Sequence, residues 1–373
     1  MTYLASVRGW AALIVLFSHI VQIFWLPFWG LDSWQHRLSS VASEYAVIVF
    51  FLLSGFLIAH SIEQNRRRNG RVRLFDFLAA RFARIYPPFA FAVLICMLVY
   101  ALLAAFSLPG YASDLKWPSD LYQVRDRITL TSGEIVRALR LQAGLLTING
   151  PLWSLYIEIR LYLLFAFGYC FLMAPRRAAL IGVLFCLTAY HSLRDSPEFV
   201  RYAGFWLAGC GAYYLRGCRI SGDQRRQALP RLAIVAGAVV VCLVVQHAVP
   251  ALKTSGGNAS VWLDFPIVIA LAAALFWRPF QLPLGRWLAP WSYSLYVVHF
   301  PLLLLCQALL IRSGNDSKLA VTLASIAGLL VAFGVGRLGG LLEGRKEFVQ
   351  SILVRSGDYI SQRFNKSLGK KGV

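Results

Sequence analysis

The sequence predicts an all-α protein: a polytopic bundle of about ten transmembrane helices with both termini in the cytoplasm. Three observations support this. Of the 373 residues, 58% are hydrophobic and only 14% are charged, the mean hydropathy is +0.61, and the apolar residues form continuous stretches of about 18–25 residues, the length that crosses a hydrocarbon core. Soluble proteins carry about 25% charged residues, and membrane barrels alternate apolar with polar residues. Both classes are therefore excluded.

The orientation of the spans follows from their connections. Residues 63–85 contain seven arginines, and short loops rich in Lys and Arg stay in the cytoplasm, so the first span enters from inside and the second returns. Continued alternation leaves 25 of the 37 basic residues in inner segments and their flanks, and makes 108–151 a long outer loop. The expected spans are 4–25, 44–62, 86–107, 152–174, 178–192, 199–216, 232–250, 261–278, 290–311 and 318–338.

Charge and cysteine content limit the partners. The net charge is +20, which the cytoplasmic bias of Lys and Arg explains without nucleic acid. We expect a membrane domain at 1–340 and a basic cytoplasmic tail at 341–373, attracted to the lipid bilayer. The seven cysteines show no metal-ligand spacing, so we expect no metal site.

Ionisable residues within spans are costly, and function is their default interpretation. Arg8 and His19 lie 11 residues apart in the first span, about three turns, so they share one helix face about 16 Å apart along the axis. Glu158, in the fourth span, is expected at the depth of His19, where a carboxylate would orient an imidazole base. The alternative is a structural ion pair of Glu158 with Arg160 or another arginine.

Two arginines end the basic connection. Arg81 and Arg84 are three residues apart, before Pro87 and Pro88 at the expected start of a helix, so they point the same way and would suit a polyphosphate. Ordinary positive-inside charge explains them equally well.

Two further segments contain small or polar residues within spans. Ser54-Gly55 indicates close helix packing. His299 lies two residues before Pro301 in the ninth span, where it would bind a ligand or form a hydrogen bond between helices.

Together these segments resemble the acyltransferase 3 family of integral membrane acyltransferases, which O-acylate extracytoplasmic glycans. Four segments in the family's order carry the resemblance: RGWAALIVLFSH with its Arg-x10-His, FFLLSGFLI followed by RFARIYP, WSLYIEIRLYLLF, and SYSLYVVHFPLL. The glutamate segment departs from the family, which often has further polar residues where this chain has Ile159, Arg160 and Leu161. No esterase-like domain is expected.

The resemblance implies site residues and substrates. His19 would be the essential base, with Glu158 beside it. Arg8, Arg81 and Arg84 would contact a cytoplasmic acyl-coenzyme A, and acetyl-coenzyme A is the form we expect. This molecule would be a co-substrate and not a permanently bound cofactor. Residues in the remaining conserved segments would contact substrate: Ser54, Tyr162 and His299.

The acceptor would be a hydroxyl of a glycan or lipo-oligosaccharide outside a bacterial inner membrane, as in O-antigen, exopolysaccharide or nodulation-factor acetylation. Its sugars would stack on loop aromatics, for which we expect Tyr111, Trp117 and Tyr122. The alternative function is a multi-span transporter or flippase, although no internal repeat is visible. A membrane scaffold would leave Arg8 and His19 without a role.

Overall fold

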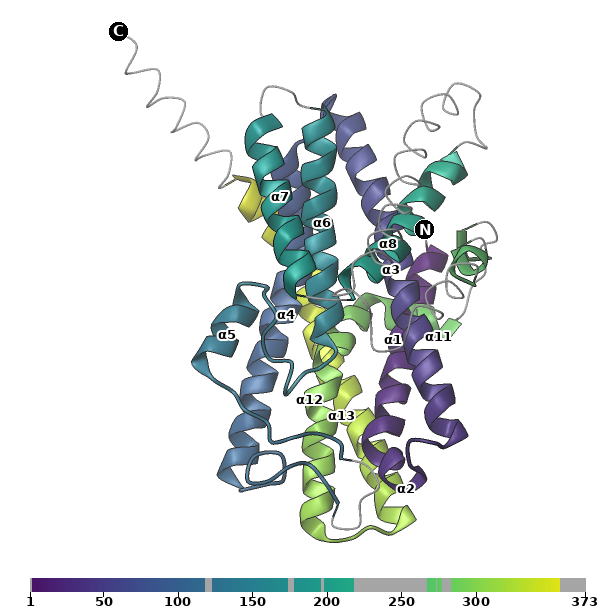
Figure 1. Ribbon diagram of the computed structural model, residues 1–373, viewed down its shortest axis with the longest axis vertical. Helices are drawn as coiled ribbons and strands as arrows, with labels where there is room; N and C mark the ends of the chain where they lie inside the picture. Colours follow the sequence, from purple (N-terminus) through teal and green to yellow (C-terminus); the bar gives the residue numbers. More distant parts are fainter. Residues whose placement is uncertain are drawn as a thin grey trace.

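The computed structural model describes residues 2–117, 123–173, 178–195, 198–217, 267–272, 274–276 and 283–355. Within these ranges helices are the regular structure, apart from one isolated bridge between Leu115 and Arg125, and Figure 1 shows them gathered into one bundle. The all-α prediction is confirmed for this part of the chain. The helices are α1 (Thr2–Ile20), the π-helical turn η1 (Val21–Trp25), α2 (Leu26–Trp29), α3 (Trp34–Asn69), α4 (Leu74–Ala105), α5 (Ser132–Leu139), α6 (Leu152–Met173), α7 (Ala178–Asp195), α8 (Phe199–Gly217), α11 (Pro283–Leu288), the 3₁₀ turn η4 (Ala289–Trp291), α12 (Ser292–Ser313) and α13 (Lys318–Gly344).

Six of the described helical segments are long and apolar enough to cross a membrane, so the protein is a multi-pass membrane protein. Two more expected spans, 178–192 and 199–216, correspond to the helices α7 and α8. The expected span 232–250 lies outside the described residues, and 261–278 is described only from 267 to 276, without residue 273. The six spanning segments are Tyr3–Trp29, Trp34–Asn69, Leu74–Ala105, Leu152–Phe171, Pro283–Ser313 and Lys318–Arg355.

The helix α1 lies at the centre of the packing. It contacts α3, α11 and α12, while α12 packs against α13 and α4, and α3 packs against α8 (Figure 1). The residues that α1 carries therefore face several other helices, and both Arg8 and His19 lie on it.

The contact between α3 and α8 depends on glycine. A Cβ on Gly55 would lie 1.9 Å from the carbonyl oxygen of Trp206, and one on Gly209 would lie 2.1 Å from that of Leu52. The two backbones approach this closely only because neither position has a side chain. The expected close packing at Ser54-Gly55 is confirmed.

The basic connection differs from the prediction. α3 continues to Asn69 and α4 begins at Leu74, so most of 63–85 is helical, and Pro87 and Pro88 lie inside α4 instead of at its start. A proline inside a helix costs about 3 kcal/mol. Burial of neighbouring side chains such as Phe77 and Phe89, at 2% and 0% exposure, offsets that cost. Similarly, α13 continues past the expected domain boundary at 340 as far as Gly344.

Candidate active site

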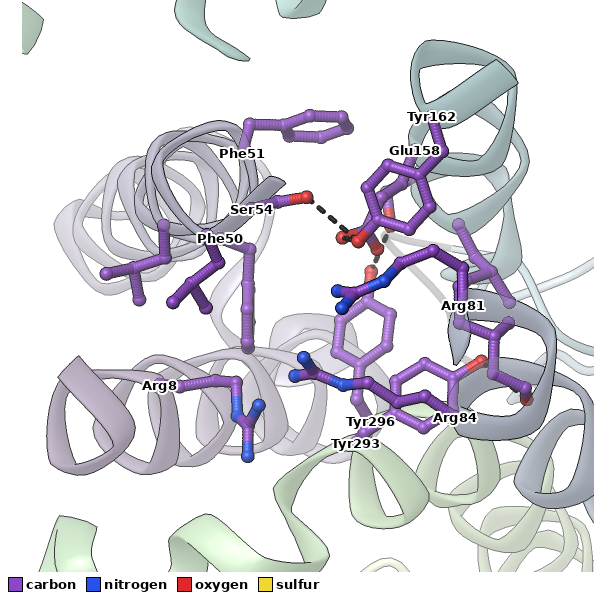
Figure 2. Close-up of a pocket in the computed structure, with 15 residues that line it drawn as sticks. Arg8, Phe50, Phe51, Ser54, Arg81, Arg84, Glu158, Tyr162, Tyr293 and Tyr296 are labelled. Atoms are coloured by element: carbon purple, nitrogen blue, oxygen red, sulfur yellow. Dashed lines mark hydrogen bonds between the residues drawn. The ribbon is translucent and has the colours of Figure 1, made fainter. Parts of the chain in front are cut away.

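Three arginines from two helices line one cavity, which we call the arginine cavity. Arg8 comes from α1, and Arg81 and Arg84 come from successive turns of α4. The cavity has a volume of about 70 Å³ and is also lined by Glu158 of α6 and Tyr296 of α12. Figure 2 shows the Arg81 and Arg84 side chains extending into the space between α3 and α6. The expectation that these two point the same way agrees with this geometry.

The three guanidinium groups outnumber Glu158, the carboxylate among the described residues that line the cavity. Arg81 donates from Nη2 to Ser61 Oγ at 3.1 Å, and its buried Nε has no hydrogen-bond partner in the described part of the chain. Arg8 donates to the Ala289 carbonyl oxygen at 2.7 Å and to Ser292 Oγ at 3.1 Å. Among described residues none of the three forms a salt bridge, whereas Arg66 in the same basic stretch pairs with Glu63 at 2.6 Å. Such a surplus of half-buried positive charge favours an anionic ligand.

A chain of hydrogen bonds fixes Glu158 in this cavity. Trp206 Nε1 donates to Ser54 Oγ at 3.2 Å. Ser54 Oγ donates to the Tyr162 hydroxyl at 3.0 Å, and Tyr162 donates to Glu158 Oε1 (Figure 2). Ser54, Tyr162 and Glu158 all line the cavity. The carboxylate therefore faces the arginines with its position set by α3 and α8.

His19 lines a second cavity, which we call the histidine cavity, with a volume of about 310 Å³. The π-helical turn that follows α1 carries Gln22, and its Oε1 lies 3.0 Å from His19 Nδ1. The His19 ring stacks on His299 with centroids 5.2 Å apart, and its edge meets Phe300 at 5.0 Å. An amide oxygen on Nδ1 favours the tautomer in which Nε2 is the acceptor.

The expected pairing of His19 with Glu158 is wrong in the structure. Each side chain has another partner, Gln22 for His19 and Tyr162 for Glu158, and they line different cavities. Two side chains at the same depth on two helices need not face each other, because each helix can present them in a different direction around the bundle. Tyr296 is the residue that lines both cavities among the described residues.

His299 is held by its own helix. Its Nδ1 lies 2.7 Å from the Tyr296 carbonyl oxygen, the side chain is buried, and Nε2 has no hydrogen-bond partner among the described atoms. Pro301 leaves the Val297 carbonyl without its helical donor, and Asn149 Nδ2 donates to that oxygen at 2.8 Å. Asn149 therefore ties the loop 108–151 to α12 beside the two histidines.

Sequence reasoning missed several polar residues of the site. Tyr296 forms the boundary between the cavities, where its hydroxyl lies 2.6 Å from Ser154 Oγ and donates to the Pro151 carbonyl oxygen at 3.0 Å. Glu343 accepts from the Ser294 amide and hydroxyl at 2.7 and 2.8 Å at the start of α12. Gln22 is a polar residue in an apolar segment, so a wider search for such residues would have found it, whereas Glu343 lies in the stretch expected to be the basic tail.

The expected sugar-stacking residues of the outer loop are placed differently. Trp117 is 3% exposed and packs against Phe28 with centroids 5.8 Å apart, so its ring is not available for stacking. Tyr111 packs against Tyr100 and the Arg127 guanidinium. Tyr122 lies outside the described residues.

Comparison with known proteins identifies the family. The model of a family described as "Acyltransferase domain", acyltransferase 3, matches residues 1–337. The chain is 35% identical to "Protein 2 in picA locus" of Rhizobium radiobacter, over 42% of this chain and 75% of that protein. It is 30% identical to "Acyltransferase MdmB" of Streptomyces mycarofaciens over 44% of this chain and 38% of that protein, and 23% identical to "O-acetyl transferase" of Shigella phage Sf6 over 78% and 81%.

No solved structure matches the chain. The family match covers the arginine cavity and the histidine cavity, and it favours an enzyme over the transporter or scaffold considered from the sequence. The chain belongs to the acyltransferase 3 family, and the protein is an enzyme that transfers acyl groups.

Proposed function

We propose that this protein is a membrane-embedded O-acyltransferase that moves an acyl group from cytoplasmic acyl-coenzyme A to a hydroxyl of an extracytoplasmic glycan or lipo-oligosaccharide. One observation carries the proposal. A cavity rich in guanidinium groups and a cavity with a histidine adjoin at Tyr296, and the two are therefore suited to different substrates.

The arginine cavity suits the donor. Coenzyme A carries a diphosphate and a further phosphate, and guanidinium groups bind phosphate oxygens bidentately. Arg81 and Arg84 have donors free for such bonds among the described contacts, whereas Arg8 is already anchored to Ala289 and Ser292. In this assignment Arg81 and Arg84 bind phosphate, and Arg8 guides the pantetheine arm along α1.

The remaining residues of this cavity shape it. Glu158 limits the positive charge between the arginines and keeps them apart, while Ser54 and Tyr162 hold Glu158 in place. Glu158 thus acts on the donor side, not as the partner of His19. No permanently bound cofactor is needed, because acyl-coenzyme A is consumed in each turnover.

His19 acts on the acceptor. With Nδ1 bonded to Gln22, Nε2 accepts the proton of the acceptor hydroxyl. The oxygen then attacks the thioester carbonyl carbon, the C–S bond breaks, and the proton passes from His19 to the departing thiolate. His299, stacked on His19, borders the reacting groups as a substrate contact.

The acyl chain must pass the Tyr296 ring to reach His19. This route sets the membrane orientation, with the arginines toward the cytoplasm, His19 toward the outside, and both termini and the basic tail 341–373 inside. The bacterial inner membrane is the site that gives access to both substrates. The printed name of the phage relative, "O-acetyl transferase", favours acetyl as the donor group.

The experiment uses inverted inner-membrane vesicles that contain the full chain and receive radiolabelled acetyl-coenzyme A. We expect label in glycan material, released by mild alkali because it is ester-linked. His19→Ala abolishes this label and Arg81→Ala reduces it, while His191→Ala, which changes an exposed histidine on α7, has no effect.

Full ester labelling with His19→Ala would overturn the role of the histidine. Label that resists alkali would overturn O-acylation. Label retained on the purified protein after removal of acetyl-coenzyme A, and lost in His19→Ala, would replace direct transfer with an acyl-histidine intermediate.

A further inference from the structure

The histidine cavity has a polar wall that the catalytic base alone does not explain. The first turns of α3 precede the apolar part of that helix and present His36, Ser39, Ser40 and Ser43 to the cavity. These positions are three or four residues apart, so they form one face of the helix. Serine is not a favourable helix residue, and four polar side chains on one cavity-facing stripe indicate a ligand with several hydroxyl groups.

Two of the serine hydroxyls facing this cavity have unused hydrogen-bonding capacity. Helical serines commonly bond to the carbonyl four residues earlier, as Ser192 and Ser325 do at 2.6 and 2.8 Å. Ser18 and Ser43 line the cavity but have no such bond, nor any other hydrogen bond among the described residues. Each therefore offers one donor and two acceptor sites to a ligand.

Aromatic rings also line this cavity. Trp153 is half-buried and Tyr202 is buried, with ring centroids 4.9 Å apart, and both line the cavity with Tyr296. The C–H groups of a pyranose ring pack on such faces while its hydroxyls bond to polar neighbours, and Trp combines both properties. The volume of about 310 Å³ lies at the lower end of small-molecule sites, which range from about 300 to 1,000 Å³.

The described lining of this cavity offers an anion no arginine or lysine side chain. Its carboxylate, Glu44, forms an ion pair with Arg201, which also lies 3.8 Å from Glu198. That guanidinium thus faces two carboxylates, and no arginine or lysine is among the residues that line the cavity. The arginine cavity has the opposite character, so the two substrates are sorted by charge.

We propose that the histidine cavity binds a neutral pyranose unit of the acceptor. Its ring packs on Trp153, its hydroxyls bond to Ser18, Ser43 and Glu44, and one hydroxyl reaches His19. This inference rests on the proposed function and assigns the acceptor to the α3–α6–α8 wall instead of the aromatic residues of the outer loop.

The test measures sugar binding without any donor. Saturation-transfer NMR on the purified full chain in nanodiscs would be run with the methyl glycosides of glucose, galactose, rhamnose and N-acetylglucosamine, and with the methyl glycoside of glucuronic acid as an anion. We expect a signal from at least one neutral glycoside and a weaker one from the glucuronide. Loss of one neutral hydrogen bond weakens binding about two- to tenfold, which is the effect expected for Ser43→Ala.

The variants separate the site from general damage. Trp153→Ala should abolish the signal and Trp153→Tyr should restore part of it, because an aromatic face returns. Trp34→Ala, at a ring 68% exposed on α3 outside the cavity, should leave binding unchanged. Each variant is first shown to bind coenzyme A as the wild type does, which establishes that it folds.

Three results would overturn the inference: no neutral glycoside binds, the glucuronide binds best, or Trp153→Ala binds sugar as well as the wild type. None of these depends on acyl transfer or on His19. The proposed function fails instead on loss of coenzyme A binding or of ester labelling, so the two failures are distinguishable.

Discussion

Replacing Gly55 by alanine tests how the packing of α3 on α8 supports the active site. The new Cβ would lie 1.9 Å from the Trp206 carbonyl oxygen, a backbone atom that cannot rotate away. The two helices must separate by roughly 1 Å for that contact to reach 3.0 Å. Ser54 is the preceding residue; its bond with Trp206 crosses the same interface, and its bond to Tyr162 links α3 to α6.

The magnitude follows from this separation. A gap of about 0.5–1 Å removes a quarter to a half of the dispersion attraction across an interface, and overpacking costs about 1–3 kcal/mol. We expect Gly55→Ala to lower the free energy of unfolding by about 3 kcal/mol, near the upper value, because the new Cβ collides with backbone atoms. In a chain of this length that corresponds to a fall in apparent melting temperature on the order of 5 °C. Coenzyme A binding should weaken as well, because Glu158 loses its support.

The assay is thermal unfolding of the purified protein in nanodiscs, with coenzyme A binding measured at 25 °C. Gly209→Ala should act similarly, since its Cβ would lie 2.1 Å from the Leu52 carbonyl oxygen. The double variant should cost less than the two single costs together, because one separation relieves both collisions. The control is Gly334→Ala in α13, where no atom lies within 4 Å and alanine adds about 0.5–1 kcal/mol of helix stability. An unchanged melting temperature for Gly55→Ala would refute the reasoning.

Three further predictions concern the two cavities. Arg81→Ala should raise the dissociation constant of coenzyme A about 10- to 100-fold, because charged hydrogen bonds are lost; the exposed Arg71→Ala should not, and equal effects in calorimetry would contradict specific phosphate binding. Gln22→Ala should lower kcat about fivefold with little change in KM for the donor, since it removes the Nδ1 partner of His19; a change in that KM alone would argue against it. Tyr296→Ala should increase acetyl-coenzyme A hydrolysis in the absence of acceptor, because the two cavities would join; free thiol release at the wild-type rate would show that the ring is not the barrier.

Much of the fold could be predicted because hydrophobic length and loop charge act locally along the chain. Six expected spans correspond to helices able to cross a membrane. The ends of the helices were harder to predict. For example, α4 begins at Leu74, 12 residues before the start of the expected span at 86–107. Arg81 and Arg84 made that stretch resemble a loop, and only the burial of side chains between them, such as Ala83 at 1% exposure, shows why the helix extends through it.

Candidate site residues could be chosen from the sequence, but the contacts between them could not. Arg8, His19 and Glu158 were identifiable because ionisable groups are expensive inside a membrane wherever they lie. Which side chains contact each other depends on how each helix is rotated about its axis and on which helices are neighbours. The sequence of a single helix specifies neither the rotation nor the neighbours. His19 therefore lies with Gln22 on its own turn and with His299 of α12, two contacts that no comparison of depths would have suggested.

Under the proposed function, the rotation of each helix and its choice of neighbours would also keep two incompatible substrates apart within one bundle. An anionic donor needs free guanidinium groups, and these would equally attract anions from the acceptor side if the cavity were continuous. Tyr296 lines both cavities, and its hydroxyl is fixed by Ser154 and by the carbonyl of Pro151 at the start of α6. If the acyl chain passes Tyr296 as proposed, movement of that ring has to break these hydrogen bonds, which lie at the amino-terminal end of α6, the helix that also carries Glu158.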